Sequence, residues 1–287
     1  MMINRYKEED MNTFFPADLA GKVAVVTGGS GVLCSEMARA LAQAGAKVAI
    51  LNRTLEKGQL VADSIGENAI AIAADVLDQA ALERAREQIT QKWGRVSILI
   101  NGAGGNNPMA TTEDEQHDPT AQVAKDFFHL DPEGIRRVFD LNFQGTLLPT
   151  MVFARDMMGM PGANIINISS MASYQPMTKV MAYAAAKAAI NNFTSWLATY
   201  FAKSGIRVNA IAPGFFATEQ NRTLLFNPDG SPTARTGKIL DATPMGRFGE
   251  PKELIGALMF LASEQAAAFV TGIVVPVDGG FMAYSGV

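Results

Sequence analysis

One stretch predicts the fold of this chain: Val23-Ala24-Val25-Val26-Thr27-Gly28-Gly29-Ser30-Gly31-Val32-Leu33-Cys34. The first five residues are an apolar run typical of a buried strand, and helix-forming residues follow the glycines. Glycines at such a turn let the backbone approach a pyrophosphate, and free N–H groups at the helix start can hold it. Strand, glycine-rich turn and helix in this order therefore indicate a dinucleotide-binding unit.

Strand-like and helix-like segments alternate along the rest of the chain. Apolar strands are predicted at 47–51, 69–73, 96–100, 165–168, 207–211 and 273–277, and helices at 36–44, up to 65, at 79–93, 133–158, 181–203 and 252–262. The helix over 133–158 is expected to fray or kink near Pro149. Near-continuous apolar strands separated by helices favour a parallel sheet covered on both faces. We therefore predict an α/β fold, a Rossmann-like doubly wound sheet in a single domain.

The chain has 287 residues, which fits one large α/β domain over 19–287, preceded by a polar arm over 1–18. Two polar stretches, 105–132 and 219–240, exceed what a minimal version of the fold needs. Long loops in compact domains are often functional, so we expect both near a substrate site, although surface insertions would look the same.

Composition and charge exclude several classes of protein. The chain has 24 basic and 28 acidic side chains and is therefore mildly acidic. The basic residues form no stripe that would predict nucleic-acid binding. No apolar run approaches the roughly 18 residues of a membrane span, and the polar N-terminus does not look like a signal peptide. The single cysteine, Cys34, fits a reducing compartment, so we expect a cytoplasmic protein. His117 and His129 lack acidic or cysteine partners at ligand spacing, so no metal site is predicted.

The candidate catalytic motif is Tyr183-Ala184-Ala185-Ala186-Lys187, with Ser170 thirteen residues before the tyrosine. Residues four apart lie on the same face of a helix, so the phenol and the ammonium should be neighbours. A fixed ammonium favours the phenolate and would lower the tyrosine pKa from about 10. The phenol could then serve as a general acid or base toward a carbonyl oxygen, which a serine hydroxyl could also hold.

The end of the second strand bears on the choice of dinucleotide. An acidic residue there would bind the ribose hydroxyls and repel a 2′-phosphate, whereas this chain has Asn52-Arg53. The repulsion is absent and a guanidinium is adjacent, which favours NADP(H) and leaves NAD(H) open, because Arg53 could equally point into solvent. Asp75, after the third strand, could accept a hydrogen bond from an adenine amino group.

Together these motifs resemble the short-chain dehydrogenase/reductase family from about Leu19 onward. The resemblance implies an NAD(P)-dependent oxidoreductase of CH–OH groups with a catalytic tetrad, Asn142, Ser170, Tyr183 and Lys187. Tyr183 would donate the proton, Ser170 would polarise the substrate oxygen, and Lys187 would lower the tyrosine pKa and hold the nicotinamide ribose. Asn142 would anchor a water in a proton relay. The implied cofactor-binding residues are Thr27, Gly28, Ser30, Val32, Leu33, Asn52, Arg53, Asp75, Val76, Asn101, Ala103, Gly104, Tyr183, Lys187, Pro213, Gly214, Phe216 and Thr218.

The glycine loop departs from the family pattern TGxxxGxG. Val32 stands in place of the second motif glycine and Cys34 in place of the third. A β-branched residue does not readily adopt positive φ, so the turn must use conformations open to L-residues. Cys34 is interpreted as a small buried packing residue rather than a redox-sensitive thiol.

Within the family, the chain is similar to the D-mannonate oxidoreductase (fructuronate reductase) branch, which also carries the valine and cysteine in the glycine loop. Shared strings include Gly31-Val32-Leu33-Cys34, Gly145-Thr146-Leu147-Leu148-Pro149-Thr150 and Ala283-Tyr284-Ser285-Gly286-Val287. A sugar-acid substrate needs amide or hydroxyl groups for its hydroxyls and a cation for its carboxylate. The candidate substrate-binding residues are Asn106, Asn107, Lys179, Gln220, Asn221 and Arg222.

Three alternatives stay open. The substrate could be another carbonyl compound, such as a keto-gluconate, a keto-sugar or a ketoacyl thioester. The chain could also be a dinucleotide-binding regulator that lacks the reaction, although all four tetrad positions are intact. We expect a homo-oligomer, a tetramer or dimer, because the last strand is apolar and the C-terminal segment 281–287 could form a subunit contact.

Overall fold

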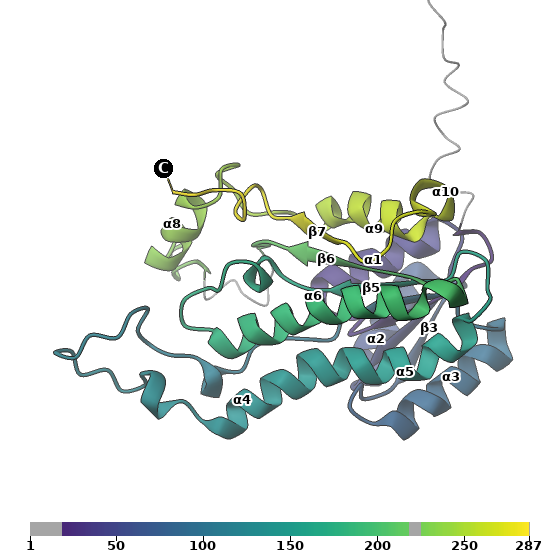
Figure 1. Cartoon of the computed structure of the whole chain (residues 1–287), viewed down its shortest axis with the longest axis horizontal. Coiled ribbons are helices and arrows are strands. Elements are labelled where there is room, and N and C mark those ends of the chain that lie inside the picture. Colours follow the sequence, from purple (N-terminus) through teal and green to yellow (C-terminus); the bar gives the residue numbers. More distant parts are fainter. Residues whose placement is uncertain (1–18, 218–224, 287) are drawn as a thin grey trace, which may run out of the picture.

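A computed structural model describes residues 19–217 and 225–286 of the chain (Figure 1). These residues form a sheet of seven parallel strands in the order β3-β2-β1-β4-β5-β6-β7. The strands are β1 (Val23–Thr27), β2 (Lys47–Asn52), β3 (Ala69–Ala73), β4 (Ile98–Asn101), β5 (Asn164–Ile168), β6 (Arg207–Pro213) and β7 (Val274–Val277). The predicted Rossmann-like architecture is confirmed, while the predicted arm over 1–18 lies outside the described residues.

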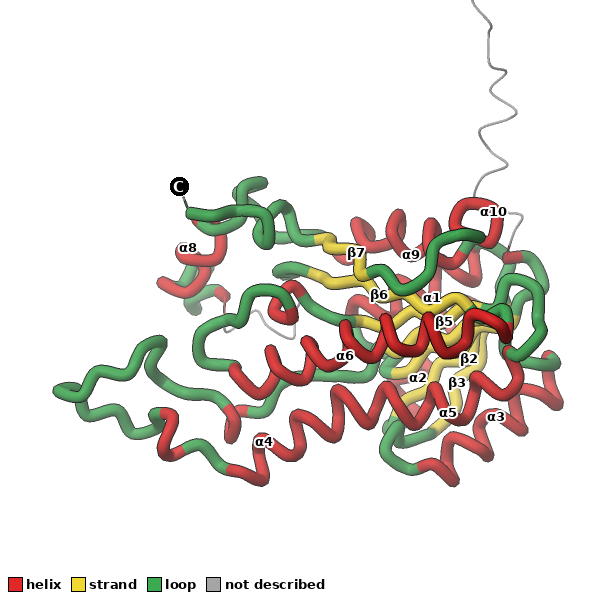
Figure 2. Tube along the Cα trace, viewed as in Figure 1, coloured by secondary structure: helices red, strands yellow, loops and turns green. Residues whose placement is uncertain are grey.

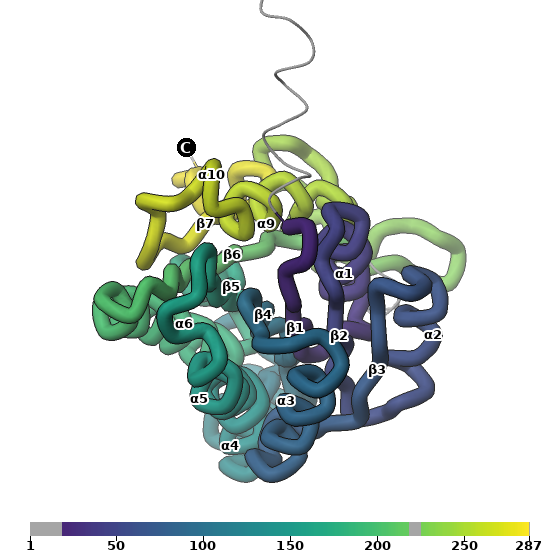
Figure 3. The backbone as a smooth tube through the Cα atoms, turned by 90° about the vertical axis from the view of Figure 1, so that its right-hand side faces the viewer, coloured from purple at the N-terminus to yellow at the C-terminus, as the bar shows by residue number. Residues whose placement is uncertain are grey.

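Helices cover both faces of the sheet (Figure 3). The longer ones are α1 (Val32–Gln43), α2 (Leu55–Ile65), α3 (Gln79–Trp93), α4 (Pro132–Phe139), α5 (Gly145–Met157), α6 (Met181–Phe201), α8 (Ala234–Asp241) and α9 (Ile255–Ala262), and α10 (Glu264–Ala267) is a single turn. One core contains Met37 of α1, Val61 of α2 and Leu258 of α9. The other contains Phe153 of α5 and Leu197 of α6. The strands lie between these two layers, so most of their side chains are buried on either face.

The sheet order reverses next to β1, which pairs with β2 on one side and with β4 on the other. In such sheets, ligands bind at the carboxyl ends of the strands where the order reverses. The glycine loop after β1 and the Asn101-Gly102-Ala103-Gly104 segment after β4 meet at that point. The topology thus brings together segments that lie far apart in the sequence.

The long helix predicted over 133–158 is present but is divided. A π-helical segment, Asp140–Gln144, separates α4 from α5. Pro149, near which fraying or a kink was expected, lies buried inside α5, and the interruption of the long helix lies at Asp140–Gln144. Proline has no N–H to donate back to Gly145, four residues earlier, and the irregular segment ends just before that residue. Single π turns inside helices are frequent at functional sites.

The first insertion and the described part of the second, from residue 225 on, project from the carboxyl end of the sheet (Figure 2). The first contains two short 3-10 turns, Pro108–Ala110 and Phe127–His129. The second contains α8, a helix that the sequence patterns did not predict, and Lys238 of α8 forms a salt bridge with Glu115 of the first insertion at 2.8 Å. In the part of the chain that the structure describes, no helix is both long and apolar enough to cross a membrane.

Candidate active site

A cavity of about 530 Å³ opens at the carboxyl ends of the central strands. Its wall is built from the glycine loop, the segment after β4, the end of β5, the start of α6 and the segment after β6. The sequence-predicted residues that line it are Gly28, Val32, Leu33, Asn52, Ala103, Gly104, Ser170, Tyr183, Lys187, Pro213, Gly214 and Phe216. The fold therefore brings most of the predicted cofactor-binding positions, and three of the four tetrad positions, to one cavity.

Ser170 and Tyr183 meet at this cavity from different elements. Ser170 follows β5, where its hydroxyl accepts a hydrogen bond from Ala172 N–H at 3.2 Å, and Tyr183 lies in the first turn of α6. Burial raises the pKa of the Tyr183 phenol, and a hydrogen bond with the Ser170 side chain partly offsets the rise. The expected lowering of the tyrosine pKa was therefore wrong for this structure, because loss of hydration outweighs the neighbouring groups.

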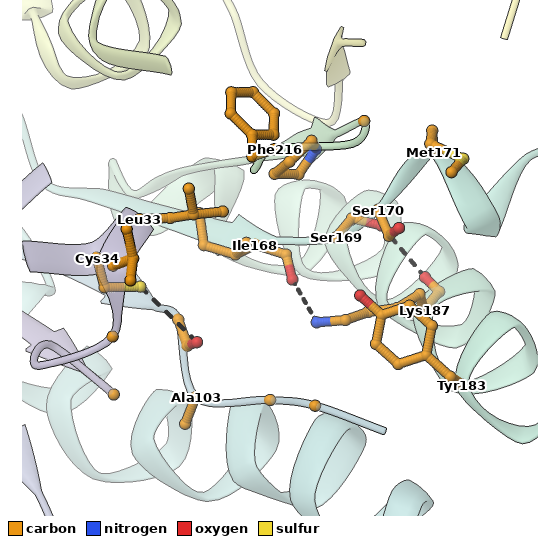
Figure 4. A pocket seen from close by; sticks show the side chains of 18 of the residues that line it. Leu33, Cys34, Ala103, Ile168, Ser169, Ser170, Met171, Tyr183, Lys187 and Phe216 are labelled. Atoms are coloured by element: carbon orange, nitrogen blue, oxygen red, sulfur yellow. Dashed lines mark hydrogen bonds between the residues drawn. The ribbon is translucent and has the colours of Figure 1, made fainter. Parts of the chain in front are cut away.

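Lys187 is buried below Tyr183, with only 4% of its surface exposed. Its Nζ donates a hydrogen bond to the carbonyl oxygen of Ile168 at 2.8 Å and lies 5.7 Å from the centre of the Tyr183 ring (Figure 4). Burial lowers the pKa of Lys187 to about 8. The predicted neighbour relation between phenol and ammonium is present, but the ammonium is directed at the end of β5.

Asn142, the fourth predicted tetrad residue, is fully buried in the π-helical segment. Its Nδ2 donates to the carbonyl oxygens of Gly105 at 2.7 Å and Val138 at 2.8 Å, and its Oδ1 accepts from Gly105 N–H at 3.2 Å. A Cβ on Gly104 would lie 2.8 Å from Asn142 Oδ1 and 3.1 Å from Lys187 Nζ. Glycine at 104 is therefore what lets Asn142 and Lys187 close around the chain after β4.

Thr27 and Asn101 support the cavity from behind. Thr27 Oγ1 accepts from the N–H groups of Gly102 at 3.0 Å and Ala103 at 3.2 Å, which joins the ends of β1 and β4. Asn101 Nδ2 donates to Asn167 Oδ1 at 2.9 Å and to Thr150 at 3.0 Å. Both residues are buried and hold the wall in place, without lining the cavity.

The altered glycine loop uses ordinary conformations at its changed positions. Gly28 takes the left-handed region with φ 62°, while Val32 begins α1. Cys34 Sγ lies 3.8 Å from the carbonyl oxygen of Gly102, and a Cβ on Gly102 would come within 2.2 Å of the sulfur. Burial raises the pKa of the Cys34 thiol to about 11, with a smaller opposing effect from Lys187. These contacts support packing as the role of Cys34.

At the end of β2, Asn52 is engaged by the glycine loop. Its Oδ1 accepts from Ser30 N–H at 3.0 Å and its Nδ2 donates to Ser30 Oγ at 2.6 Å. Arg53 is exposed. Asp75 Oδ1 accepts from Leu77 N–H at 2.9 Å, and Val76 is buried against Gly145. Ser30, Arg53, Asp75 and Val76 are absent from the cavity lining among the residues that the structure describes.

The predicted substrate-binding residues that the structure describes, Asn106, Asn107 and Lys179, do not line this cavity. Asn106 Nδ2 donates to Thr111 Oγ1 at 2.8 Å, and Asn107 Oδ1 caps the turn after it by accepting from Met109 N–H at 2.9 Å. Both asparagines thus hold their own loop, and Lys179 lies outside the lining as well. Thr218, Gln220, Asn221 and Arg222 fall outside the described residues.

Sequence reasoning missed four apolar residues of the cavity lining, Ile168, Met171, Met177 and Phe215. Phe215 directly follows the Pro213-Gly214 pair, so its place beside the site could have been read from that motif. Met177 lies in the irregular segment before α6 and carries no comparable signal. No group of three or more potential metal ligands occurs within residues 19–217 and 225–286.

A nicotinamide dinucleotide fits the groups present at the cavity. No side chain of the described residues caps the start of α1 at Gly31, so the N–H groups of its first turn are available to a phosphate. A Cβ on Gly28 would lie 2.9 Å from Ala103 Cα, so this glycine keeps the two strand ends in contact at the cavity edge. The glycine loop would hold the pyrophosphate, and Lys187 lies where the nicotinamide half would meet Tyr183 and Ser170.

Residues 22–227 match the short chain dehydrogenase family. The chain belongs to this family. It is 58% identical over 273 residues to the Bacillus subtilis (strain 168) "Uncharacterized oxidoreductase UxuB", which covers 94% of this chain and 98% of that protein. A Haemophilus influenzae crystal structure with bound NAD, provisionally named a D-mannonate oxidoreductase, is 54% identical with a TM-score of 0.91, covering 94% of this chain and 98% of that one. A Burkholderia cenocepacia gluconate 5-dehydrogenase, solved with NADP and tartrate, is 30% identical with a TM-score of 0.79 over 94% and 99% of the two chains.

The chain is thus an NAD(P)-dependent oxidoreductase that acts on CH–OH groups, and its relatives bind small-molecule substrates together with the cofactor. Related structures carry either dinucleotide, NAD in one and NADP in another. The predicted enzyme class is confirmed.

Proposed function

We propose that the protein transfers hydride between a nicotinamide cofactor and a sugar acid. It would reduce D-fructuronate to D-mannonate, or oxidise D-mannonate to D-fructuronate in the reverse direction. The observation that supports this most strongly is the contact between the Ser170 hydroxyl and the Tyr183 phenol, which line one cavity together with several glycines. The buried Lys187 Nζ lies 5.7 Å from the centre of the Tyr183 ring. A phenol and a hydroxyl side by side can both donate a hydrogen bond to the same carbonyl oxygen, because that oxygen accepts two hydrogen bonds.

The proton steps belong to the side chains of this chain. In reduction, the Ser170 hydroxyl holds the substrate oxygen and Tyr183 Oη donates the proton to it, so that the ketone becomes an alcohol. The reduced nicotinamide supplies the hydride that the carbonyl carbon gains. A positively charged Lys187 near the phenol stabilises the tyrosinate left by the proton transfer. Asn142 keeps the backbone at Gly105 in place beside these groups.

For the cofactor, we propose either NADP(H) or NAD(H), with NADP(H) favoured by the neutral Asn52 and the exposed cation Arg53 at the end of β2. The NAD bound to the Haemophilus influenzae relative argues in the other direction. The side chains at the end of β2 therefore decide between the two dinucleotides, and an assay of turnover with NADPH and NADH in parallel measures the preference.

Two observations support a sugar acid as substrate. Two structural relatives are named for sugar-acid reactions, mannonate in one and gluconate in the other. Cationic side chains also gather next to the cavity, at Lys179, Arg235 and Lys238. A keto-gluconate would meet the same requirements, and a keto-sugar or ketoacyl thioester is the remaining enzymatic alternative.

We also propose a homo-oligomer, a tetramer or dimer. The outer face of α5 and α6 exposes Met151 by 47%, Trp196 by 56% and Tyr200 by 65%. The Trp196 and Tyr200 rings stack with centres 4.8 Å apart. A contiguous apolar patch of this kind is typical of subunit contacts, and the C-terminal segment 281–286 is a second candidate. Light scattering coupled to gel filtration measures the assembly, and a monomeric mass would refute the proposal.

The deciding experiment is a spectrophotometric assay of D-fructuronate with NADH and NADPH in parallel. We expect turnover of D-fructuronate to exceed that of a 2-keto-gluconate, a neutral keto-sugar and a ketoacyl thioester assayed under the same conditions. If one of these carbonyl compounds is turned over faster, the proposed substrate is wrong. If none is turned over with either dinucleotide, the regulator hypothesis is favoured.

A further inference from the structure

A second cavity, of about 310 Å³, lies next to the active-site cavity. The two share Met177 and Phe215 in their walls, so they lie directly beside each other. Arg235 and Lys238 of α8 line the second cavity together with Glu115 of the 105–132 insertion. Residues from both insertions thus meet at the edge of the candidate active site.

The charges at this second cavity are unbalanced. Glu115 Oε2 lies 2.8 Å from Lys238 Nζ, and the hydrogen bond from Lys238, followed by the charges of Lys238, Lys179 and Arg235, lowers the pKa of the Glu115 carboxyl. Arg235 is half-buried, and it has no ion-pair partner within the described part of the chain. Two cations, Arg235 and Lys238, therefore share this cavity with one carboxylate, and the charge of Lys179 adds to theirs from outside the lining, which leaves capacity for a second anionic group.

Lys179, which directly follows the lining residue Thr178, is held in an unusual backbone conformation. Its φ of 73° is the only positive value for a non-glycine residue within residues 19–217 and 225–286. Such strain persists only where the surroundings enforce it, and it clusters at ligand sites. The Lys179 carbonyl oxygen accepts a hydrogen bond from Thr112 N–H at 3.0 Å, which ties the segment before α6 to the insertion that carries Glu115.

We propose that Arg235 and Lys238 form the site for the substrate carboxylate, with the charge of Lys179 nearby, and that Glu115 occupies this site as an internal substitute that the substrate displaces. This inference rests on the proposed function, because it assigns the acid end of the sugar acid to a place. D-Fructuronate has its ketone near one end of the carbon chain and its carboxylate at the other. With the ketone at Tyr183, the carboxylate extends past Met177 and Phe215 into the second cavity.

The geometry suits a displaceable contact. The Lys238 side chain is 67% exposed and that of Glu115 35% exposed, and ion pairs in contact with solvent contribute little to stability. A substrate carboxylate that also reaches the half-buried Arg235 can gain a bidentate contact, which the single Glu115–Lys238 pair lacks. Glu115 would then raise the apparent KM for any anionic substrate and leave kcat nearly unchanged.

Steady-state kinetics with D-fructuronate and the preferred dinucleotide test this inference. In the Arg235→Gln/Lys238→Met variant, we expect the KM for D-fructuronate to rise about tenfold or more while kcat and the cofactor KM stay within about twofold. Glu115→Gln should lower the KM for D-fructuronate about threefold, because it removes the internal competitor. Arg84→Gln, which removes an exposed cation of α3 near Asp78, is the matched control and should change neither constant.

The two variants move KM in opposite directions only if Glu115 competes with substrate. A higher KM in Glu115→Gln would mean that the Glu115–Lys238 pair holds the insertion in place for substrate binding, and it would overturn the inference. An unchanged KM in the Arg235→Gln/Lys238→Met variant would overturn it as well. If the double variant has a lower thermal midpoint than wild type, Lys238→Met alone gives the decision, because that side chain is exposed. Absence of wild-type turnover with D-fructuronate refutes the proposed function itself, which is a different result from turnover without these KM changes.

Discussion

Lys187 Nζ donates a hydrogen bond to the carbonyl oxygen of Ile168 at 2.8 Å, across the gap between α6 and the end of β5. The contact gives the buried ammonium one backbone oxygen as its hydrogen-bond partner, at the position where the end of β5 meets α6. Because the group is almost completely buried, its charge is costly, and the pKa of Lys187 falls to about 8.

The first prediction concerns the pH dependence of stability. The pKa of Lys187 is about 8 in the fold and 10.5 for the unperturbed group, so between these values the unfolded chain binds more protons. The stability of wild type relative to Lys187→Met should therefore rise with pH across this window, by about 3 kcal/mol in total, and stay level below pH 8. Urea unfolding of both proteins from pH 7 to pH 10 measures the difference. Lys92→Met, at an exposed position of α3, is the control, and a difference that falls with pH would contradict the prediction.

Tyr183→Phe removes the proposed proton donor and little volume. We expect kcat to drop by about a hundredfold to ten-thousandfold, because general acid–base groups contribute that much, while the cofactor Kd changes little. Stopped assays for kcat and fluorescence titration of the dinucleotide test the two expectations. Tyr174→Phe serves as control, since its hydroxyl only reaches the carbonyl oxygen of Val274 at 3.4 Å. Full activity in Tyr183→Phe would refute the mechanism.

Gly104→Ala should damage the site by crowding it. The added Cβ would come within 2.8 Å of Asn142 Oδ1 and 3.1 Å of Lys187 Nζ, so both side chains or the backbone must move. We expect a loss of about 1–3 kcal/mol in the free energy of unfolding and a lower kcat. Gly256→Ala in α9 is the matched control, because its Cβ would meet nothing within 4 Å and alanine favours a helix. Equal stability of the two variants would argue against the close packing described for Gly104.

Asn52→Asp should shift cofactor choice toward NAD(H). An aspartate keeps the bond accepted from Ser30 N–H, and it can accept from the Ser30 hydroxyl, to which the Asn52 amide now donates, so the loop should keep its shape. The new charge would repel a 2′-phosphate, and we expect kcat/KM with NADPH to fall about tenfold while the value with NADH is retained. Asn52→Ser, which adds no charge, separates repulsion from loss of the amide. Equal losses with both dinucleotides would place the 2′-phosphate elsewhere.

Cys34 should be a slow thiol in the folded protein. The thiolate is the reactive form, and a pKa of about 11 leaves about one molecule in a thousand ionised at pH 8. We expect iodoacetamide to label the native protein negligibly and the urea-unfolded protein completely, as followed by intact mass. Rapid labelling of the native protein would revive the redox interpretation.

The fold was predictable because its signals are local. Apolar runs of strand length, helical periodicity and the turn at Gly28 are all properties of neighbouring residues. The exceptions are informative. The π-helical segment at 140–144 and helix α8 depend on contacts with other segments, such as the Asn142 bonds to Gly105, and no local pattern announces them.

For the candidate site, the sequence alone predicted which side chains would carry the chemistry. It also determined that Tyr183 and Lys187 share a helix face, because a spacing of four residues is enough for that. The tertiary structure decided their electrostatics. Burial sets the pKa direction of Tyr183 and Lys187, and burial is a property of the packed core rather than of sequence spacing. Packing also placed Glu115 against Lys238, more than a hundred residues away, because only the folded sheet brings its two long insertions to the same edge.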